Sequence, residues 1–181
     1  MVRTFIAPNK YIQGPHVLEN VGEYASKLGN KVLVLISSGG KKRFGAAIEK
    51  SLEEAGLEFV VEVFNGECCR KEINRLDEEV KENNYNLVVA VGGGKVFDTA
   101  KAVAYYNDIP IIICPTIAAT DAPCSALSVI YTEEGEVEEE VETESECRSG
   151  RLCNYCEVSG PFNGIRHGGC FGNIYRSKSF L

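Results

Sequence analysis

Residues 1–131 alternate short β-rich runs with longer amphipathic runs, and this alternation limits the possible folds more than any other feature. Runs of β-branched and apolar residues predict strands at 31–36, 58–64, 86–91 and 110–114. Between them, apolar residues recur at helical spacing and predict helices over 43–55, 70–83 and 96–106. Strands that alternate with helices form a mainly parallel sheet. We therefore expect an α/β, doubly wound domain.

The composition changes abruptly after Tyr131. Residues 133–146 are dominated by Glu, and the residues beyond them are rich in Cys, Gly and Arg without strand or helix periodicity. We expect the α/β domain to occupy residues 1–136 and an acidic linker with an irregular tail to occupy 137–181. The acidic run is interpreted as a solvated, disordered linker or a solvated helix face. The tail is expected to lack a stable core.

Charge and hydropathy narrow the class of partner. The formal net charge of −7 disfavours nucleic acid and anionic membranes, which both require a basic face. No apolar run approaches the roughly 20 residues that span a bilayer, and the first apolar stretch is too short for a signal peptide. We expect a cytoplasmic protein without disulfides whose partner is a small molecule, not nucleic acid or a membrane.

A glycine turn, Gly-Gly-Gly-Lys at 92–95, joins the predicted strand 86–91 to a helix. Backbone N–H groups at such a helix start, together with the helix dipole, can bind pyrophosphate. The turn lacks a glycine five positions before Gly94, and Val96 replaces the Ser or Thr of a Walker motif. Phe97 stands where the ordinary dinucleotide fingerprint has its third glycine. The turn alone supports a phosphate site and a plain turn equally.

A second polar loop, residues 115–131, follows the last predicted strand. Ligands of open α/β sheets bind outside the carboxyl ends of strands, so this loop and the glycine turn should line one crevice. Asp121 is a candidate acceptor for a substrate hydroxyl, and Thr116 and Ser125 are candidate donors. A capping Asp and turn-forming Ser and Thr explain the same residues equally well.

Four stretches together resemble the glycerol dehydrogenase family of iron- or zinc-dependent alcohol dehydrogenases. They are residues 8–14, 66–68, 92–101 and, most specifically, 115–131, and the similarity runs from about residue 1 to 136. The resemblance implies a Rossmann-like, dehydroquinate synthase-type cofactor domain and NAD-dependent oxidation of glycerol to dihydroxyacetone. It also implies a zinc ion that polarises the substrate hydroxyl, so that its proton leaves before the hydride. A homo-oligomer is implied for full-length members, and nothing is implied for this chain alone.

The resemblance further implies a role for individual positions. Asp121 would bind glycerol, and Gly94, Lys95 and Asp98 would hold the cofactor's phosphates and sugar. The full set implied to bind the cofactor is Gly93, Gly94, Lys95, Asp98, Thr116, Ala119, Ser125, Leu127 and Tyr131. Ser37 departs from the family, which usually has an acidic residue there for the adenosine ribose. This departure leaves the preference for NAD open.

The metal ligands implied by the resemblance have no counterpart in these residues. The family uses one Asp in a Gly-Met-Gly-Asp-Ala-like stretch and two His from a carboxyl-terminal helical domain, whereas His16 and His167 match neither motif. We therefore assign no metal ligand and no certain catalytic residue, and we expect the helical domain to be absent. Permitted codons for residues 166–175, read one base out of register, encode Gly-Met-Gly-Asp-Ala-Leu-Ala-Thr-Tyr. A frameshifted tail is therefore expected.

Three functional interpretations stay open. The first is a truncated glycerol dehydrogenase that is nearly inactive alone, and the second is a non-catalytic nucleotide-binding remnant. The third is a domain with a metal-binding tail, because Cys153 and Cys156 have the spacing of half a zinc knuckle. A second such pair is missing, since Cys147 and Cys170 are isolated. The coding DNA distinguishes the first interpretation from the others.

Overall fold

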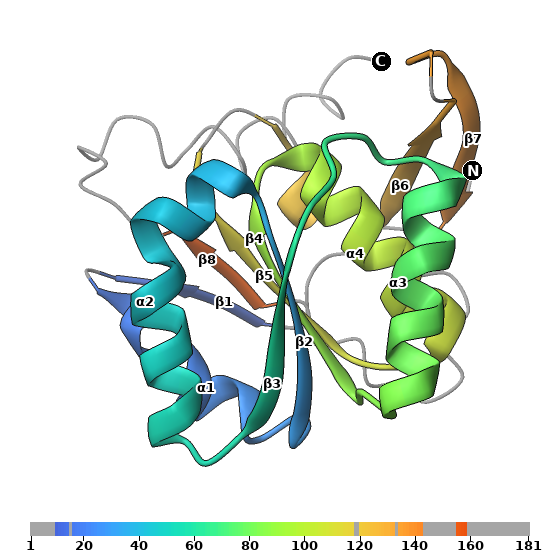
Figure 1. Cartoon of the computed structure of the whole chain (residues 1–181). Coiled ribbons are helices and arrows are strands. Elements are labelled where there is room, and N and C mark those ends of the chain that lie inside the picture. The colour runs from blue at the N-terminus through green and yellow to red at the C-terminus, as the bar shows by residue number, and fades with distance from the viewer. Residues whose placement is uncertain (1–9, 15, 118–119, 133, 143–154, 159–181) are drawn as a thin grey trace, which may run out of the picture.

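The computed structural model describes residues 10–14, 16–117, 120–132, 134–142 and 155–158. In this part of the chain, six strands form one sheet in the order β1-β8-β5-β4-β2-β3, with every pairing parallel (Figure 1). The strands are β1 (Lys10–Gln13), β2 (Lys31–Ile36), β3 (Glu58–Val63), β4 (Leu87–Gly92), β5 (Ile111–Pro115) and β8 (Tyr155–Val158). The predicted parallel sheet is confirmed.

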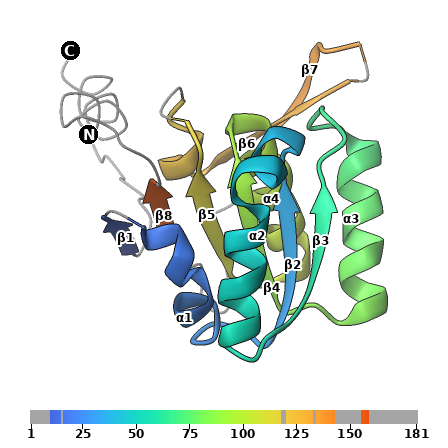
Figure 2. The same ribbon diagram turned by 60° about the vertical axis from the view of Figure 1, so that its left-hand side comes forward.

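Helices cover both faces of this sheet (Figures 1 and 2). They are η1 (Val17–Asn20), α1 (Val21–Ala25), α2 (Ser38–Glu54), α3 (Arg70–Asn83) and α4 (Gly94–Asn107). Alternate residues of β2 enter opposite cores: Val34 packs with α1 and α2, whereas Leu35 packs with α3 and α4. Strand residues alternate between faces, so two apolar layers form on one sheet and the fold is doubly wound. None of the described helices is long and apolar enough to cross a membrane.

The order of the strands places a switch point between β2 and β4. Strand β3 lies on one side of β2, and the chain then crosses to form β4 on the other side. Crossovers on opposite faces leave a crevice at the carboxyl ends of such strands. The turns that follow β2 and β4 therefore lie at the position where open α/β sheets bind ligands.

The predicted elements agree with the structure apart from some of their ends. Strand 31–36 is as predicted, and the other three predicted strands each shift by one residue at one or both ends. Helix α2 begins at Ser38, five residues before the predicted start, because Ser37 caps it: Ser37 Oγ accepts a hydrogen bond from Gly40 N at 3.1 Å. The cap extends the helix through a Gly-Gly pair that breaks the apolar periodicity.

The first residues of the expected acidic linker form a strand instead. Val137–Glu142 forms strand β7, which pairs antiparallel with β6 (Leu127–Tyr131) and projects beside α3 (Figure 1). Val141 packs against the core, and Glu139 forms an ion pair with Arg70. Cross-strand pairing and one long-range ion pair thus override a composition that favours a linker.

The tail beyond residue 142 also contains a strand, although no element was expected there. Strand β8 pairs in parallel with β1 on one side and β5 on the other. Residues 143–154 and 159–181 lie outside the described residues, so the proposed boundary at 136 and the expectation of a tail without a core stay predictions.

Candidate functional site

A cleft of about 300 Å³ lies at the carboxyl ends of β2, β3 and β4. The residues that line it are Ser37, Ser38, Phe64, Gly66, Gly93, Gly94, Lys95 and Val96. Gly93, in extended conformation, caps α4, which begins at Gly94 with its first N–H groups at the cleft. Unpaired N–H groups and the helix dipole favour an anion at such an end. The predicted glycine turn therefore lies at the switch point, where a dinucleotide pyrophosphate would fit.

The loop after β5 lies close over this turn. A Cβ atom on Gly94 would lie 3.3 Å from Thr120 Cγ2, and one on Gly93 would lie 3.4 Å from Ile117 Cδ1. Thr116 ties the two segments together, since its Oγ1 and its backbone N donate to Gly92 O at 3.1 and 2.9 Å. The absence of side chains at Gly93 and Gly94 therefore lets the loop after β5 pack closely against the turn. Ala119 lies outside the described residues.

Lys95 and Tyr131 come together at this site. Lys95 Nζ lies 5.8 Å from the centre of the Tyr131 ring and 2.5 Å from Glu67 Oε2. The lysine side chain is 54% exposed, so it can reach a ligand in the cleft. Glu67 belongs to the stretch 66–68 that carries the family resemblance, but the sequence assigns it no role.

Asp98 is turned toward the protein interior. Its Oδ1 lies 2.9 Å from Lys101 Nζ, and burial raises the pKa of Asp98 even though Lys101 lowers it. Lys101 is itself buried, and its Nζ donates to the carbonyls of Ala122, Ser125 and Leu127 at 3.1, 3.3 and 2.5 Å. In this conformation the Asp98 carboxylate forms an ion pair with the lysine that holds the next loop, and its contact with a cofactor sugar stays a prediction.

No role was predicted for Lys101 from the sequence. One signal was available: a lysine stands three residues after Asp98, on the buried stripe of a helix. A charged residue at an apolar position requires a buried partner, and residues three apart share one helix face.

The remaining predicted residues lie on the loop that Lys101 holds. Asp121 is exposed at the start of η2 (Ala122–Cys124), and its side chain makes no capping hydrogen bond. Ser125 Oγ bonds both the N and the O of Leu127 at 3.1 Å, which is a turn-forming role. Asp121 is therefore the better placed of the two for a ligand hydroxyl.

Nothing in the described part of the chain fits a metal site. These residues contain no group of three or more His, Cys, Asp or Glu side chains that could hold an ion. Burial raises the pKa of the Cys68 thiol to about 12, so this thiol is protonated near neutral pH. Of the proposed zinc knuckle, Cys153 and the Cys156 side chain lie outside what is described, as does His167.

Comparisons with known proteins agree on one family. The model of the iron-containing alcohol dehydrogenases matches residues 8–148. Glycerol dehydrogenase from Pseudomonas putida is 45% identical over 139 residues, which cover 75% of this chain and 37% of that protein. The enzyme of Escherichia coli O6:H1 is 47% identical over 139 residues, with the same two shares. The chain thus spans about 37% of the length of these curated relatives.

A solved structure of a probable glycerol dehydrogenase is also similar to this chain. The crystal structure of a probable glycerol dehydrogenase from Sinorhizobium meliloti 1021 superposes with a TM-score of 0.75 at 38% identity, over 86% of this chain and 41% of that one.

Proposed function

This chain belongs to the iron-containing alcohol dehydrogenase family, and from that premise we propose that it is the NAD-binding part of a glycerol dehydrogenase. One observation carries the proposal: the glycine turn 92–95 lies at the switch point of a parallel sheet, and Ile117 and Thr120 of the loop after β5 pack against it. The glycerol dehydrogenases among the relatives favour this function over a non-catalytic nucleotide-binding remnant.

The residues present fit a dinucleotide. The backbone of Gly93 and Gly94 lines the cleft without a side chain, so a pyrophosphate could approach it closely, and the first N–H groups of α4 and Lys95 supply positive charge. NAD, when bound, supplies the acceptor for the hydride of the alcohol. Asp121 would accept a hydrogen bond from a glycerol hydroxyl and orient its carbon toward the nicotinamide, which Tyr131 and Leu127 would border.

The proposal includes low activity for this 181-residue polypeptide alone. Forming an alkoxide near neutral pH requires a strong electrostatic aid, and none of the 181 residues matches the family's Asp and two His ligands. The described residues do not fit the metal, so no step is assigned to it here. We propose that the missing ligand motif is encoded one base out of register at residues 166–175.

Binding of NADH tests the cofactor assignment. We expect weak but saturable binding by the wild-type chain, measured by nicotinamide fluorescence. Gly94→Val should weaken binding by about tenfold or more, because its side chain would crowd Thr120 and Ala122 and displace the loop from the turn that is proposed to bind the pyrophosphate. Gly45→Ala, which meets only the flexible Lys41 side chain in α2, is the matched control and should bind like wild type. Equal affinity of the Gly94→Val variant, or no binding by a folded wild-type chain, would refute the proposal.

A further inference from the structure

We propose that Glu67 is a built-in competitor for the phosphate-binding lysine: its carboxylate pairs with Lys95 until the pyrophosphate of a dinucleotide displaces it. This inference rests on the proposed dinucleotide site. It assigns a role to the stretch 66–68, which the proposed function leaves unused. Glu67 then sets the affinity of the cleft for phosphate-bearing ligands, as a positioning residue that acts through Lys95.

The carboxylate of Glu67 is held in place. Its Oε1 accepts a hydrogen bond from Cys68 N at 3.1 Å, while Oε2 lies 2.5 Å from Lys95 Nζ. The loop itself is bound to β6, because Tyr131 N donates to Cys68 O at 2.7 Å and Cys69 forms an isolated bridge with Tyr131. Both oxygens are therefore engaged on an anchored loop, so the ion pair is a defined contact.

The ion pair lies at the edge of the cleft. Gly66, directly before Glu67, lines the cleft together with Gly93, Gly94 and Lys95. The side chains of Glu67 and Lys95 are 29% and 54% exposed, so the pair meets solvent and can open. A ligand phosphate at the start of α4 and the Glu67 carboxylate would compete for the same ammonium group.

The charges at the cleft determine whether removal of the Glu67 carboxylate strengthens or weakens phosphate binding. The negative charge of Glu67 cancels the positive charge of Lys95, which leaves a phosphate mainly the dipole of α4, about half a positive charge. Removing the carboxylate frees Lys95 and also removes a repulsion from the anionic ligand. The alternative role, in which Glu67 holds Lys95 ready for the phosphate, predicts weaker binding after the same change.

The size of the effect follows from exposure. Exposed ion pairs are worth little and are screened by salt, so a change of about threefold in the dissociation constant is expected at low ionic strength. The effect should require a phosphate on the ligand. ADP carries the pyrophosphate, whereas adenosine has the same base and sugar without it.

The experiment measures ADP and adenosine binding to the full chain by calorimetry or ligand-detected NMR. Glu67→Gln keeps an acceptor for Cys68 N but removes the charge, and we expect it to bind ADP about threefold more tightly at roughly 20 mM salt. This gain should shrink at about 0.5 M salt, and adenosine binding should not change. Glu82→Gln is the matched control, because it removes one exposed carboxylate at the far end of α3, about 20 Å from the loop.

Three results of these binding measurements would overturn the proposed role of Glu67. Unchanged or weaker ADP binding by the Glu67→Gln chain overturns the inference while leaving the proposed function intact. An equal gain in the Glu82→Gln chain overturns it too, since net charge would then be the cause. If folded wild-type and Glu67→Gln chains bind neither ADP nor NADH, the proposed function itself fails and the inference fails with it.

Discussion

At the scale of the residue, Lys101 is the clearest case of a side chain that serves the site without lining the cleft. A buried ammonium group is stable only when hydrogen bonds and an opposite charge replace its water. Lys101 meets both requirements with the carbonyls of Ala122, Ser125 and Leu127 and with Asp98. The loop that carries Asp121, the residue proposed to bind glycerol, is thus held in place by one side chain.

The first prediction concerns the replacement Lys101→Met. It leaves the Asp98 carboxylate buried without a counter-charge, so the free energy of unfolding should fall by about 3 kcal/mol at pH 7, measured by urea denaturation. Lys50→Met is the control, because Lys50 is 74% exposed in its pair with Glu54, and its effect should stay within about 0.5 kcal/mol. Equal stability of the two variants would contradict the role of Lys101.

The stability that the Lys101→Met variant loses should also depend on pH, and urea denaturation at two pH values measures this. Burial raises the pKa of Asp98 above its ordinary value, so the folded state favours the protonated acid. Protonation therefore contributes stability below the unfolded pKa, and this contribution disappears as pH rises through the folded pKa. Removing Lys101 raises the folded pKa further, so the deficit of the Lys101→Met chain should be smaller at about pH 4 than at pH 7.

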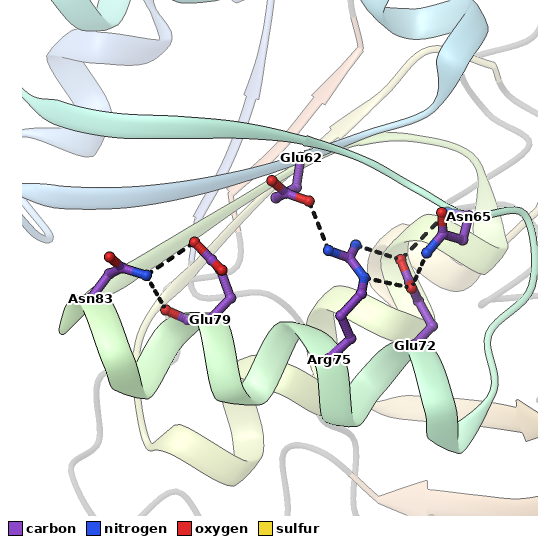
Figure 3. A network of polar contacts seen from close by, with 6 residues as sticks. All are labelled: Glu62, Asn65, Glu72, Arg75, Glu79 and Asn83. Atoms are coloured by element: carbon purple, nitrogen blue, oxygen red, sulfur yellow. Dashed lines mark hydrogen bonds and ion pairs between the residues drawn. The ribbon is translucent and has the colours of Figure 1, made fainter.

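At the scale of the element, a polar network fixes α3 to the end of β3 (Figure 3). Glu72, which is only 3% exposed, accepts hydrogen bonds from Asn65 Nδ2 at 2.6 Å and from Arg75 Nε and Nη2 at 3.0 Å. Arg75 Nη1 also donates to Glu62 on β3 at 2.8 Å. These bonds raise the pKa of the Arg75 guanidinium, so it stays charged. The network orients the start of the helix and the loop that carries Glu67.

The second prediction is made for this network. Arg75→Met removes two donors from a buried carboxylate, so it should lower the free energy of unfolding by about 2 kcal/mol. Lys81→Met on the same helix is the matched control, since its pair with Asp77 is an exposed pair within one helix, and its cost should be about 0.5 kcal/mol or less. Thermal or urea unfolding compares them. A cost as small as that of the control would show that the network does not anchor the helix.

At the scale of the whole molecule, the proposed reaction has two requirements, cofactor binding and activation of the substrate hydroxyl. The chain spans about 37% of the length of its curated relatives and contains the proposed cofactor site. Under the proposed function, the described residues are expected to bind the dinucleotide, whereas hydroxyl activation is expected to require the family's metal ligands, which these residues do not match.

The third prediction tests this division. A gene with the reading frame restored before residues 166–175 should produce a protein that oxidises glycerol with NAD in a zinc-dependent way. The 181-residue chain should be slower by a factor on the order of a thousand, because a central electrostatic contribution of several kcal/mol is missing. NADH formation is followed by absorbance with and without a chelator. Comparable turnover by the two proteins would refute the claim.

The sequence by itself determined the class of fold and predicted where the candidate site lies. Strand and helix periodicities are local, so residues 31–36 and 70–83 could be recognised without knowing their neighbours. The turn 92–95 could be placed at a strand end for the same reason, and with it the edge of the sheet where a ligand is expected. The family motif then favoured a cofactor site over an ordinary turn.

Only the tertiary structure decided which partners the charged side chains meet. Glu67 and Lys95 are 28 residues apart, Lys101 and Leu127 are 26 apart, and Arg70 and Glu139 are 69 apart. No local pattern encodes such pairs, because each depends on how loops from different strands are brought together at one edge. The same reason explains why composition did not predict strand β7. Its glutamates are compatible with solvent exposure, and only the pairing with β6 makes this segment a strand.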